Sequence, residues 1–225
     1  MSNSSLVCHT RLSPNRTSPR THPIDTITIH HMAAVNASVE ACGAGFASPA
    51  RRASANYGIG SDGRVALYVE ETDRSWASSD SANDHRAVTI EVANSDAGPD
   101  WPVSEAAYAA LIDLCADICR RNGIRKLVWA ADQGDRVNHR GGANMTVHRD
   151  FAATACPGNY LLGRMGDIAA RVNLKLEDET MTVDEAKRIM KEKARLSDET
   201  VDYLWSYRFG DELLVKLAQA MRGGG

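Results

Sequence analysis

Residues 24–31 read IDTITIHH, and residues 87–93 read AVTIEVA. In both stretches apolar residues alternate with smaller or polar ones, and many residues are β-branched. This pattern predicts β-strands. Because successive side chains of a strand point to opposite faces, each strand has an apolar face and a smaller, more polar face. His30 and Glu91 lie on the two polar faces. If these faces line one cleft, a metal ligand and an acid–base group come together there.

The segments around these strands alternate between predicted strands and helices. Residues 1–23, rich in Ser, Thr and Pro, and residues 131–147, rich in Gly and Asn, are expected to be irregular. We therefore expect an α/β domain over residues 1–178, with a central mixed β-sheet flanked by helices. The remaining predicted elements are a helix over 38–46, a hairpin of 56–60 and 64–69, a helix from Ser104 to Arg121, a short strand over 126–130 and a helix from about 158 to 172.

Composition narrows the class of protein. The 225 residues are 43% hydrophobic and 24% charged, with a net charge of −3, so we expect a globular protein without a nucleic-acid partner. No apolar run approaches the ~18 residues of a membrane span, so we expect no membrane partner. Residues 1–20 lack the apolar segment of a signal peptide, which predicts synthesis in the cytoplasm. The five cysteines show no disulfide-type spacing, which fits a reducing compartment.

His148 and Cys156 lie eight residues apart in VHRDFAATACPG, residues 147–158. A histidine nitrogen and a cysteine thiolate both bind Zn²⁺, although such a pair alone is also common in proteins without a metal. A third ligand has to come from another part of the chain, and His30 and His31 are the candidates. Adjacent strand residues face opposite ways, so at most one of these two histidines can join the site.

Several motifs in this chain, in this order, resemble the type 2 N-acetylmuramoyl-L-alanine amidases, a family that includes phage endolysins and peptidoglycan recognition proteins. The resemblance covers roughly residues 24–172. The motifs are ITIHH at 27–31, SANYGIGSDGRVALYV at 54–69, RSW at 74–76, NDHRAVTIEVAN at 83–94 and VHRDFAATACPG at 147–158.

The resemblance implies a zinc enzyme. It assigns His30, His148 and Cys156 as ligands of Zn²⁺ and Glu91 as the acid–base group. Zinc-activated water would cleave the amide bond between N-acetylmuramic acid and L-alanine of the peptidoglycan stem peptide, with Glu91 moving the proton. The protein would be a phage or prophage endolysin, or a bacterial autolysin, that acts on the cell wall after release from the cytoplasm.

The sequence also departs from the family pattern. Many members carry a lysine two residues before the last ligand, where this chain has Thr154, whose hydroxyl can assist catalysis without a charge. The hairpin position often occupied by histidine is Asn56. We expect Asn56, Trp76 and His85 to bind substrate, although core packing for Trp76 and a surface loop for His85 are open alternatives.

Two other functions are compatible with parts of the sequence. A peptidoglycan-binding module without catalysis typically lacks the metal thiolate, and this chain has Cys156. A structural zinc site usually has four protein ligands, and the sequence offers three convincing ones.

Residues 179–225 follow a different pattern. The charged stretch 175–180 is expected to interrupt the α/β domain, and the chain from Val183 onward predicts three short amphipathic helices. Because such short helices are not stable alone in water, their apolar stripes have to pack on one another, on the domain or on a second copy. We expect a small helical module that targets the cell wall or forms a homodimer.

Overall fold

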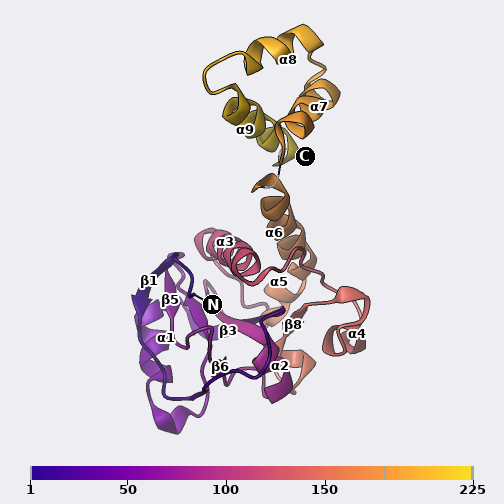
Figure 1. Cartoon of the computed structure of the whole chain (residues 1–225). Coiled ribbons are helices and arrows are strands. Elements are labelled where there is room, and N and C mark those ends of the chain that lie inside the picture. The colour runs from indigo at the N-terminus through magenta and orange to yellow at the C-terminus, as the bar shows by residue number, and fades with distance from the viewer. Residues whose placement is uncertain (1, 180, 224–225) are drawn as a thin grey trace. The chain divides into compact units, whose positions relative to one another are not determined.

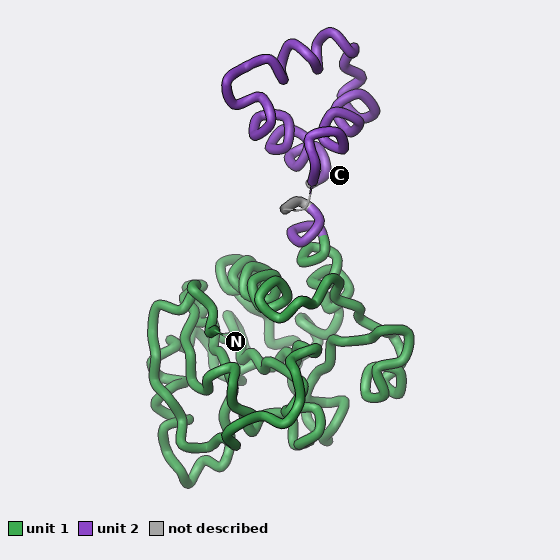
Figure 2. Tube along the Cα trace, in the orientation of Figure 1, with its two compact units in different colours: residues 1–173 green, residues 174–225 purple. Residues whose placement is uncertain are grey.

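The computed structural model describes residues 2–179 and 181–223 of the chain. The chain divides into two compact units, residues 1–173 and 174–225, which Figure 2 shows in different colours. The first unit contains a mixed β-sheet with helices around it, and the second unit consists of helices (Figure 1). The predicted fold class, a mixed sheet flanked by helices with helices at the C-terminal end, is confirmed.

A six-stranded sheet organises the first unit. Its strands are β1 (Val7–Thr10), β3 (Thr26–Val35), β4 (Tyr57–Ile59), β5 (Val65–Leu67), β7 (Ala87–Asn94) and β8 (Met145–Val147). Their spatial order is β1-β5-β4-β7-β3-β8. Strands β4 and β5 form the predicted antiparallel hairpin, and the other neighbouring strands are parallel. A separate pair joins β2 (Arg16–Thr17) to β6 (Arg74–Ser75).

Helices and helical turns connect these strands. They are α1 (Val39–Phe46), η1 (Pro49–Arg51), α2 (Ser81–Arg86), α3 (Glu105–Asn122), α4 (Gln133–Val137), η2 (Arg140–Gly142), η3 (His148–Asp150), α5 (Gly158–Leu162) and α6 (Met165–Glu179). Helix α3 begins as predicted after Ser104, whose hydroxyl accepts a hydrogen bond from the N–H of Ala107 at 3.1 Å. It ends at Gly123, whose φ of 71° suits a residue without a Cβ.

The neighbouring parallel strands β3 and β7 form the centre of the fold. Their register pairs His30 with Glu91, so the two residues stand side by side on one face of the sheet. The opposite face carries isoleucine and valine side chains, and Ile29 and Ile90 are each 0% exposed. The predicted division of each strand into an apolar and a more polar face is therefore confirmed.

The polar face of these strands is covered by hydrogen-bonded side chains. Thr28 Oγ1 lies 2.8 Å from Thr146 Oγ1 of β8 and accepts a hydrogen bond from the Asn83 amide of α2 at 3.0 Å. On β7, Thr89 Oγ1 lies 2.7 Å from Ser75 Oγ of β6. Because buried hydroxyl and amide groups are stable only when they are bonded, this network fixes α2 and β6 over the sheet.

The predicted strand over residues 126–130 is wrong, because its backbone groups bond to side chains instead of a neighbouring strand. The Asn173 amide donates to the carbonyl of Leu127 at 2.9 Å and accepts from its N–H at 2.8 Å. The side-chain Oδ1 of Asn144 accepts from the N–H of Val128 at 2.8 Å, and the backbone N–H of Asn144 donates to the carbonyl of Val128 at 3.2 Å. Two asparagines thus replace the strand partner that the sequence pattern suggests.

Two segments expected to be irregular contain regular structure. Residues 1–23 contribute β1 and β2, and residues 131–147 contain α4, η2 and β8. These short strands depend on partners distant in the sequence. The N-terminal segment is also held by Arg20, which donates hydrogen bonds to the backbone carbonyls of Glu71, Asp73, His85 and Ala87.

The predicted helix over 158–172 is two helices, α5 and α6. The second of them continues to Glu179, so the charged stretch expected to interrupt the domain is helical as far as that residue. Thr180, the last residue of the stretch, lies outside the described residues. The error arises because charged side chains are compatible with an exposed helix surface.

The second unit contains the three short helices that the sequence predicts, α7 (Val183–Ala194), α8 (Asp198–Trp205) and α9 (Gly210–Gly223). Thr182 caps α7 by accepting a hydrogen bond from the N–H of Glu185 at 3.2 Å. Within the described part of the chain, no helix is both long and apolar enough to span a membrane. The helices share a core that contains Met181, Ala186, Ile189, Met190, Val201, Leu214 and Ala218.

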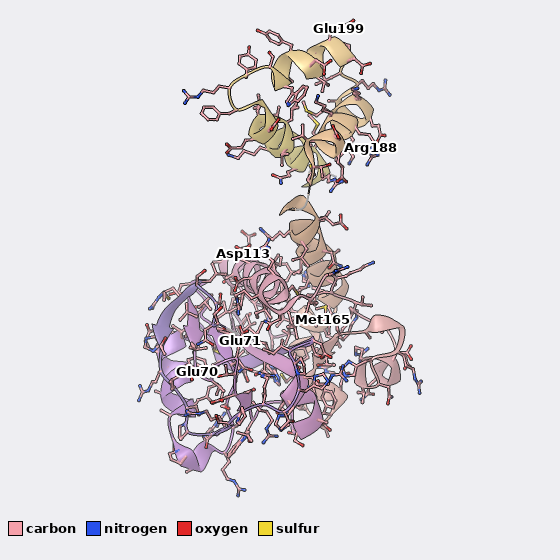
Figure 3. All side chains as sticks on the ribbon, in the orientation of Figure 1. Glu70, Glu71, Asp113, Met165, Arg188 and Glu199 are labelled. Atoms are coloured by element: carbon pink, nitrogen blue, oxygen red, sulfur yellow. The ribbon has the colours of Figure 1, made fainter. Side chains whose placement is uncertain are left out.

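Glu71 is a buried carboxylate that joins the sheet to helix α3; it is labelled with its exposed neighbour Glu70 in Figure 3. Its oxygens accept hydrogen bonds from the Tyr57 hydroxyl at 2.6 Å and from the Arg121 guanidinium at 2.7 and 2.9 Å. The amide of Asn122 donates to it at 3.1 Å. The carboxylate therefore compensates a cation and a hydroxyl that are themselves largely buried.

We predict that Glu71→Ala lowers the free energy of unfolding by about 3 kcal/mol, because it leaves the Arg121 charge and the Tyr57 hydroxyl without their partner. Urea unfolding followed by circular dichroism measures the change. The matched control is Glu70→Ala, which should alter stability by less than ~0.5 kcal/mol. Equal effects of the two substitutions would show that the Glu71 network does not stabilise the fold.

Candidate active site

The site begins where β3 and β8 run next to each other. The register pairs Ile29 with Val147, and His148 follows Val147 at the start of η3. His148 therefore emerges close to His30, and the two ring centres are 5.0 Å apart. His30 is 1% exposed, whereas His148 is half-buried. The strand pairing thus brings together two imidazoles that are far apart in the sequence.

Cys156 completes a group of three possible metal ligands. Its Sγ lies 3.6 Å from His30 Nδ1 and accepts a hydrogen bond from the N–H of His31 at 3.4 Å. His30, His148 and Cys156 each offer one ligand atom, and these three atoms lie within 4.8 Å of one another. The structure therefore brings together the three residues that the sequence assigned as ligands.

The donor set and its spacing suit Zn²⁺. Ligand bonds of about 2.0 Å to nitrogen and 2.3 Å to sulfur, at a tetrahedral angle, separate the two ligand atoms by about 3.5 Å. The separation between His30 Nδ1 and Cys156 Sγ is 3.6 Å. Two imidazoles and one thiolate are also borderline and soft ligands of the kind that zinc prefers. The residues present therefore fit a zinc ion.

Burial favours the neutral form of the histidines and opposes the thiolate. Burial, with smaller contributions from His148 and His31, lowers the pKa of His30 to about 3, and burial also lowers the pKa of His148. Both rings are then in the form that binds metal at neutral pH. Burial and the nearby Glu91 raise the pKa of the Cys156 thiol, so its thiolate needs a compensating cation such as a metal ion.

The segment that carries Cys156 is held by hydrogen bonds to its backbone. The Thr154 hydroxyl accepts from the N–H of Cys156 at 3.2 Å, and Arg149 Nε donates to the carbonyl of Cys156 at 3.2 Å. On the other side of the site, Ser79 Oγ lies 3.3 Å from His148 Nε2. Such partners orient ligands and are as much a part of a metal site as the ligands themselves.

Arg136 and Asp150 form a buried ion pair beneath η3. The guanidinium donates to the carboxylate at 2.6 and 2.9 Å, and Asp150 also accepts a hydrogen bond from the N–H of Val147 at 3.0 Å. This pair fixes the turn that presents His148. Arg136, Asp150 and Ser79 were not predicted as site residues. No local pattern could have joined Arg136 to Asp150, because the pairing depends on how the intervening segment folds.

Glu91 stands beside the ligands with one uncompensated oxygen. Its Oε2 is buried and has no hydrogen-bond partner among the residues that the structure describes. Burial raises the pKa of Glu91 to about 8, against a smaller opposing effect of Arg51. A carboxyl group of this kind, next to a possible metal site, is suited to exchange protons near neutral pH.

A cleft of about 280 Å³ opens at Glu91. It lies against α1 and the C-terminal end of β3. Most of its wall is apolar or formed by small residues, so it can receive short alkyl groups next to the carboxyl group. The residues that line it are Met32, Ala34, Ala37, Ala41, Cys42, Gly45, Phe46, Arg51 and Glu91.

The structure places the predicted substrate-binding residues away from this group. Asn56 is 0% exposed, and its amide donates to the carbonyl of Val69 and accepts from the N–H of Thr89, both at 3.1 Å. It thus holds the hairpin to β7 and is too deeply buried to contact a substrate. This placement corrects the prediction, which overlooked that a buried amide bonds to backbone groups.

Trp76 and His85 contact the N-terminal segment. Trp76 Nε1 donates to Thr17 Oγ1 at 2.9 Å, and His85 Nδ1 accepts from the N–H of Thr21 at 3.0 Å. His85 lies in α2, before the start of β7, and Glu91 is a further four residues or ~13 Å along that strand from its first residue. These contacts support the packing alternative for Trp76 and the surface alternative for His85.

His31, the other candidate ligand, faces away from the site. Its Nδ1 lies 3.2 Å from Asn94 Oδ1, and its ring packs beside Trp101 at a centroid distance of 5.0 Å. This is the opposite-face position that strand geometry requires when His30 faces the ligands. Thr154 is exposed and remains available to a substrate.

An α/β sheet with two histidines, a cysteine and a half-buried carboxyl group at one site is typical of metal-dependent hydrolases. The sequence identifies the family within that class. The family model described as N-acetylmuramoyl-L-alanine amidase matches residues 20–159, and the chain belongs to this family. The matched residues include all five motifs that resemble this family and all three candidate ligands. No curated protein matches the chain.

Solved structures share the fold. The catalytic domain of XlyA has a TM-score of 0.54 at 17% identity and covers 73% of this chain and 97% of that one. An AmpD derivative has a TM-score of 0.53 at 18% identity, with coverage of 74% and 96%. A mutant endolysin from Bacillus subtilis has a TM-score of 0.52 at 17% identity, with coverage of 73% and 97%.

We predict that Cys156→Ser weakens zinc binding, because a hydroxyl is a poor zinc ligand. The loss of affinity should exceed the ~10–100-fold typical for removing a residue that only hydrogen-bonds to a ligand. Competition with a chelator, followed by metal analysis of the protein, measures the affinity. The control is Cys8→Ser, since Cys8 is an exposed free cysteine. Unchanged zinc affinity of Cys156→Ser would exclude this thiol as a ligand.

Proposed function

We propose that the protein hydrolyses the amide bond between the lactyl group of N-acetylmuramic acid and L-alanine in peptidoglycan, with Zn²⁺ held by His30, His148 and Cys156. Membership of the N-acetylmuramoyl-L-alanine amidase family supports the reaction. The observation that carries the proposal is the register that sets Glu91 beside His30 at the ligand cluster.

Three protein ligands leave zinc a fourth position, where the ion would polarise the substrate carbonyl and lower the pKa of a water molecule to about 7. The thiolate of Cys156 and the neutral ring of His30 need to be buried to keep water from competing for the ion. Both residues are buried, at 6% and 1% exposure. His148 is half-buried, so part of its ring is accessible from solvent.

Glu91 is the residue that moves the proton. A cation at the ligand cluster would lower the pKa of Glu91 from about 8, because opposite charges stabilise the carboxylate form. The Oε2 atom then accepts a proton from the attacking water and returns it to the nitrogen of the leaving L-alanine. A pKa near the working pH suits both transfers.

Thr154 is proposed to assist at the carbonyl oxygen. Its Oγ1 accepts a hydrogen bond from the N–H of Cys156, so the hydroxyl proton is free to point elsewhere. Donation of that proton to the oxygen that becomes negative in the transition state would stabilise it. The backbone contact with Cys156 keeps the hydroxyl at a fixed position beside the ligand.

Neither alternative function accounts for Glu91. A module that only binds peptidoglycan gains nothing from a buried carboxyl group with an uncompensated oxygen, and such a group reduces stability. A structural zinc site would need a fourth ligand. Among the described residues, the only group of candidate ligands contains His30, His148 and Cys156.

We predict that Glu91→Gln retains zinc but lowers turnover by ~10²–10⁴, because the substitution keeps the shape of the side chain and removes the proton acceptor. Turnover is followed as the release of peptides with an L-alanine amino terminus from purified peptidoglycan. Metal analysis of the same preparation verifies that zinc is bound. Near-normal turnover of the zinc-loaded variant would exclude Glu91 as the proton carrier.

We further propose that the helical module at the C-terminal end directs the enzyme to the cell wall or dimerises it. The module has its own buried core, and it also exposes a group of aromatic side chains on and after α8. Exposed aromatic side chains in one short segment are characteristic of surfaces that bind a partner. They are Tyr203, Trp205, Tyr207 and Phe209, which are 63%, 47%, 52% and 65% exposed.

We predict that a chain ending at Asp178 still cleaves small soluble muropeptides but loses binding to intact cell walls, or becomes monomeric if the full chain is a dimer. Sedimentation with purified walls and analytical ultracentrifugation measure the two properties. A full-length variant with Tyr203→Ser and Phe209→Ser tests the aromatic group, and Arg188→Ser on the exposed surface of α7 is its control (Figure 3). Unchanged wall binding and oligomeric state in the shortened chain would contradict the proposal.

A further inference from the structure

Ser79 combines a strained backbone with a contact to a candidate metal ligand. Its φ is 67°, in the left-handed region that residues with a Cβ rarely adopt. Its Oγ lies 3.3 Å from Nε2 of His148. A residue other than glycine persists in such a conformation only when its surroundings fix it, and residues of this kind are concentrated at functional sites. The position therefore points to a role of the serine side chain that glycine could not fill.

The backbone on both sides of Ser79 is fixed by hydrogen bonds. The buried carboxylate of Asp84 accepts from the N–H of Ala77 at 2.9 Å and from the N–H of Ser78 at 3.2 Å. The Ser78 hydroxyl donates to the carbonyl of Asp80 at 3.2 Å and accepts from its N–H at the same distance. Because both neighbours are anchored, the backbone of Ser79 cannot relax without breaking these bonds.

The helix that follows this segment is tied to both strands that lead to the histidine ligands. The side chain of Asn83, in α2, donates to Thr28 Oγ1 at 3.0 Å and accepts from Thr146 Oγ1 at 3.1 Å. Thr28 precedes His30 by two residues on β3, and Thr146 precedes His148 by two residues on β8. The fold thus anchors the two histidines and the serine segment to one hydrogen-bonded framework.

The two histidines differ in how firmly their rings are held. His30 is 1% exposed, and its Nδ1 faces Cys156 Sγ at 3.6 Å. His148 is half-buried, so packing restrains its ring less. A histidine that binds a metal almost always donates its other ring N–H to a partner that sets the ring orientation. At His148 the Ser79 hydroxyl occupies the place of that partner.

One arrangement of the protons leaves a nitrogen of His148 free for an ion. If the Ser79 hydroxyl donated to Nε2, the neutral ring would carry its own proton on Nδ1, and both nitrogens would be occupied. If Nε2–H donates to Ser79 Oγ instead, the lone pair of Nδ1 is free to bind. Nδ1 is also the nitrogen that His30 directs toward Cys156.

We infer that Ser79 is a positioning residue of the metal site, whose hydroxyl accepts a hydrogen bond from Nε2–H of His148 and so reserves Nδ1 of that ring for the ion. The inference rests on the zinc site of the proposed function and adds a residue that acts on the ion through a ligand. Glycine would suit the backbone at this position better, but it has no hydroxyl. The serine side chain therefore serves the ligand, against the preference of the backbone.

Ser79→Gly removes the hydroxyl and places a residue without a Cβ at the positive φ. We expect the zinc affinity of the full-length protein, measured by competition with a chelator, to fall ~10–100-fold, which is typical for the loss of a ligand's hydrogen-bond partner. The urea midpoint of the metal-free protein should change little, because glycine adopts this φ without strain. Unchanged zinc affinity would overturn the inference, whatever happens to the midpoint.

The matched control is Ser81→Gly, since Ser81 is an exposed serine at the first residue of α2. It makes the same chemical change two residues further along the chain and should leave zinc affinity unchanged. An equal loss of affinity in the two variants would show that glycine merely loosens the segment, and it would contradict a role of the Ser79 hydroxyl.

Nitrogen NMR of the labelled imidazole rings in the zinc-loaded wild-type protein tests the assignment without any substitution. We expect zinc at Nδ1 of His148 and a proton on Nε2 that exchanges slowly with water. In Ser79→Gly the zinc should stay at Nδ1, and the Nε2 proton should exchange faster because it has lost its acceptor. Zinc at Nε2 of His148 in the wild-type protein would overturn the inference, because the nitrogen beside Ser79 would then be the ligand.

Both measurements are independent of hydrolysis, so they separate this inference from the proposed function. A protein that binds zinc through Nδ1 of His148 with help from Ser79, yet cleaves no peptidoglycan, would contradict the proposed function alone. A protein that cleaves peptidoglycan and binds zinc equally well without the Ser79 hydroxyl would contradict this inference alone. A wild-type protein that binds no zinc would contradict both.

Discussion

The parallel pairing of β3 with β7 is the constraint on which the rest of the structure depends. It sets His30 beside Glu91 and leaves Ile29 and Ile90 on the opposite, buried face. A shift of one residue would turn each strand over, so the apolar core and the site are fixed by the same register. Because β8 pairs with the other edge of β3, that register also decides where His148 emerges.

Hydrogen bonding along the polar face distinguishes the structural part of this face from the reactive part. Below the site, Thr28 and Thr89 are bonded to side chains of neighbouring elements. At the site itself, Glu91 Oε2 is buried without a hydrogen-bond partner in the described structure. Since buried polar atoms are normally bonded, this oxygen indicates a place reserved for an ion, water or substrate.

Local sequence patterns predicted the parts of the fold that depend on neighbours in the chain. The alternation of β3 and β7 placed His30 and Glu91 on matching faces, and Ser104 marked the start of α3. Strands of three or four residues such as β1 and β8 were missed, because they are stabilised by distant partners. The prediction for Asn56 failed for the same reason, and the cleft beside Glu91 could not be predicted because it forms only in the folded chain.

The most direct test of the central claim is mass spectrometry of purified peptidoglycan digested by the zinc-loaded protein in water enriched in heavy oxygen. Hydrolysis at the proposed bond predicts peptides that begin with the free amino group of L-alanine. It also predicts heavy oxygen in the lactyl carboxylate of N-acetylmuramic acid, because water attacks the carbonyl carbon. New reducing sugar ends, cleavage within the stem peptide, or the absence of released peptides would contradict the account.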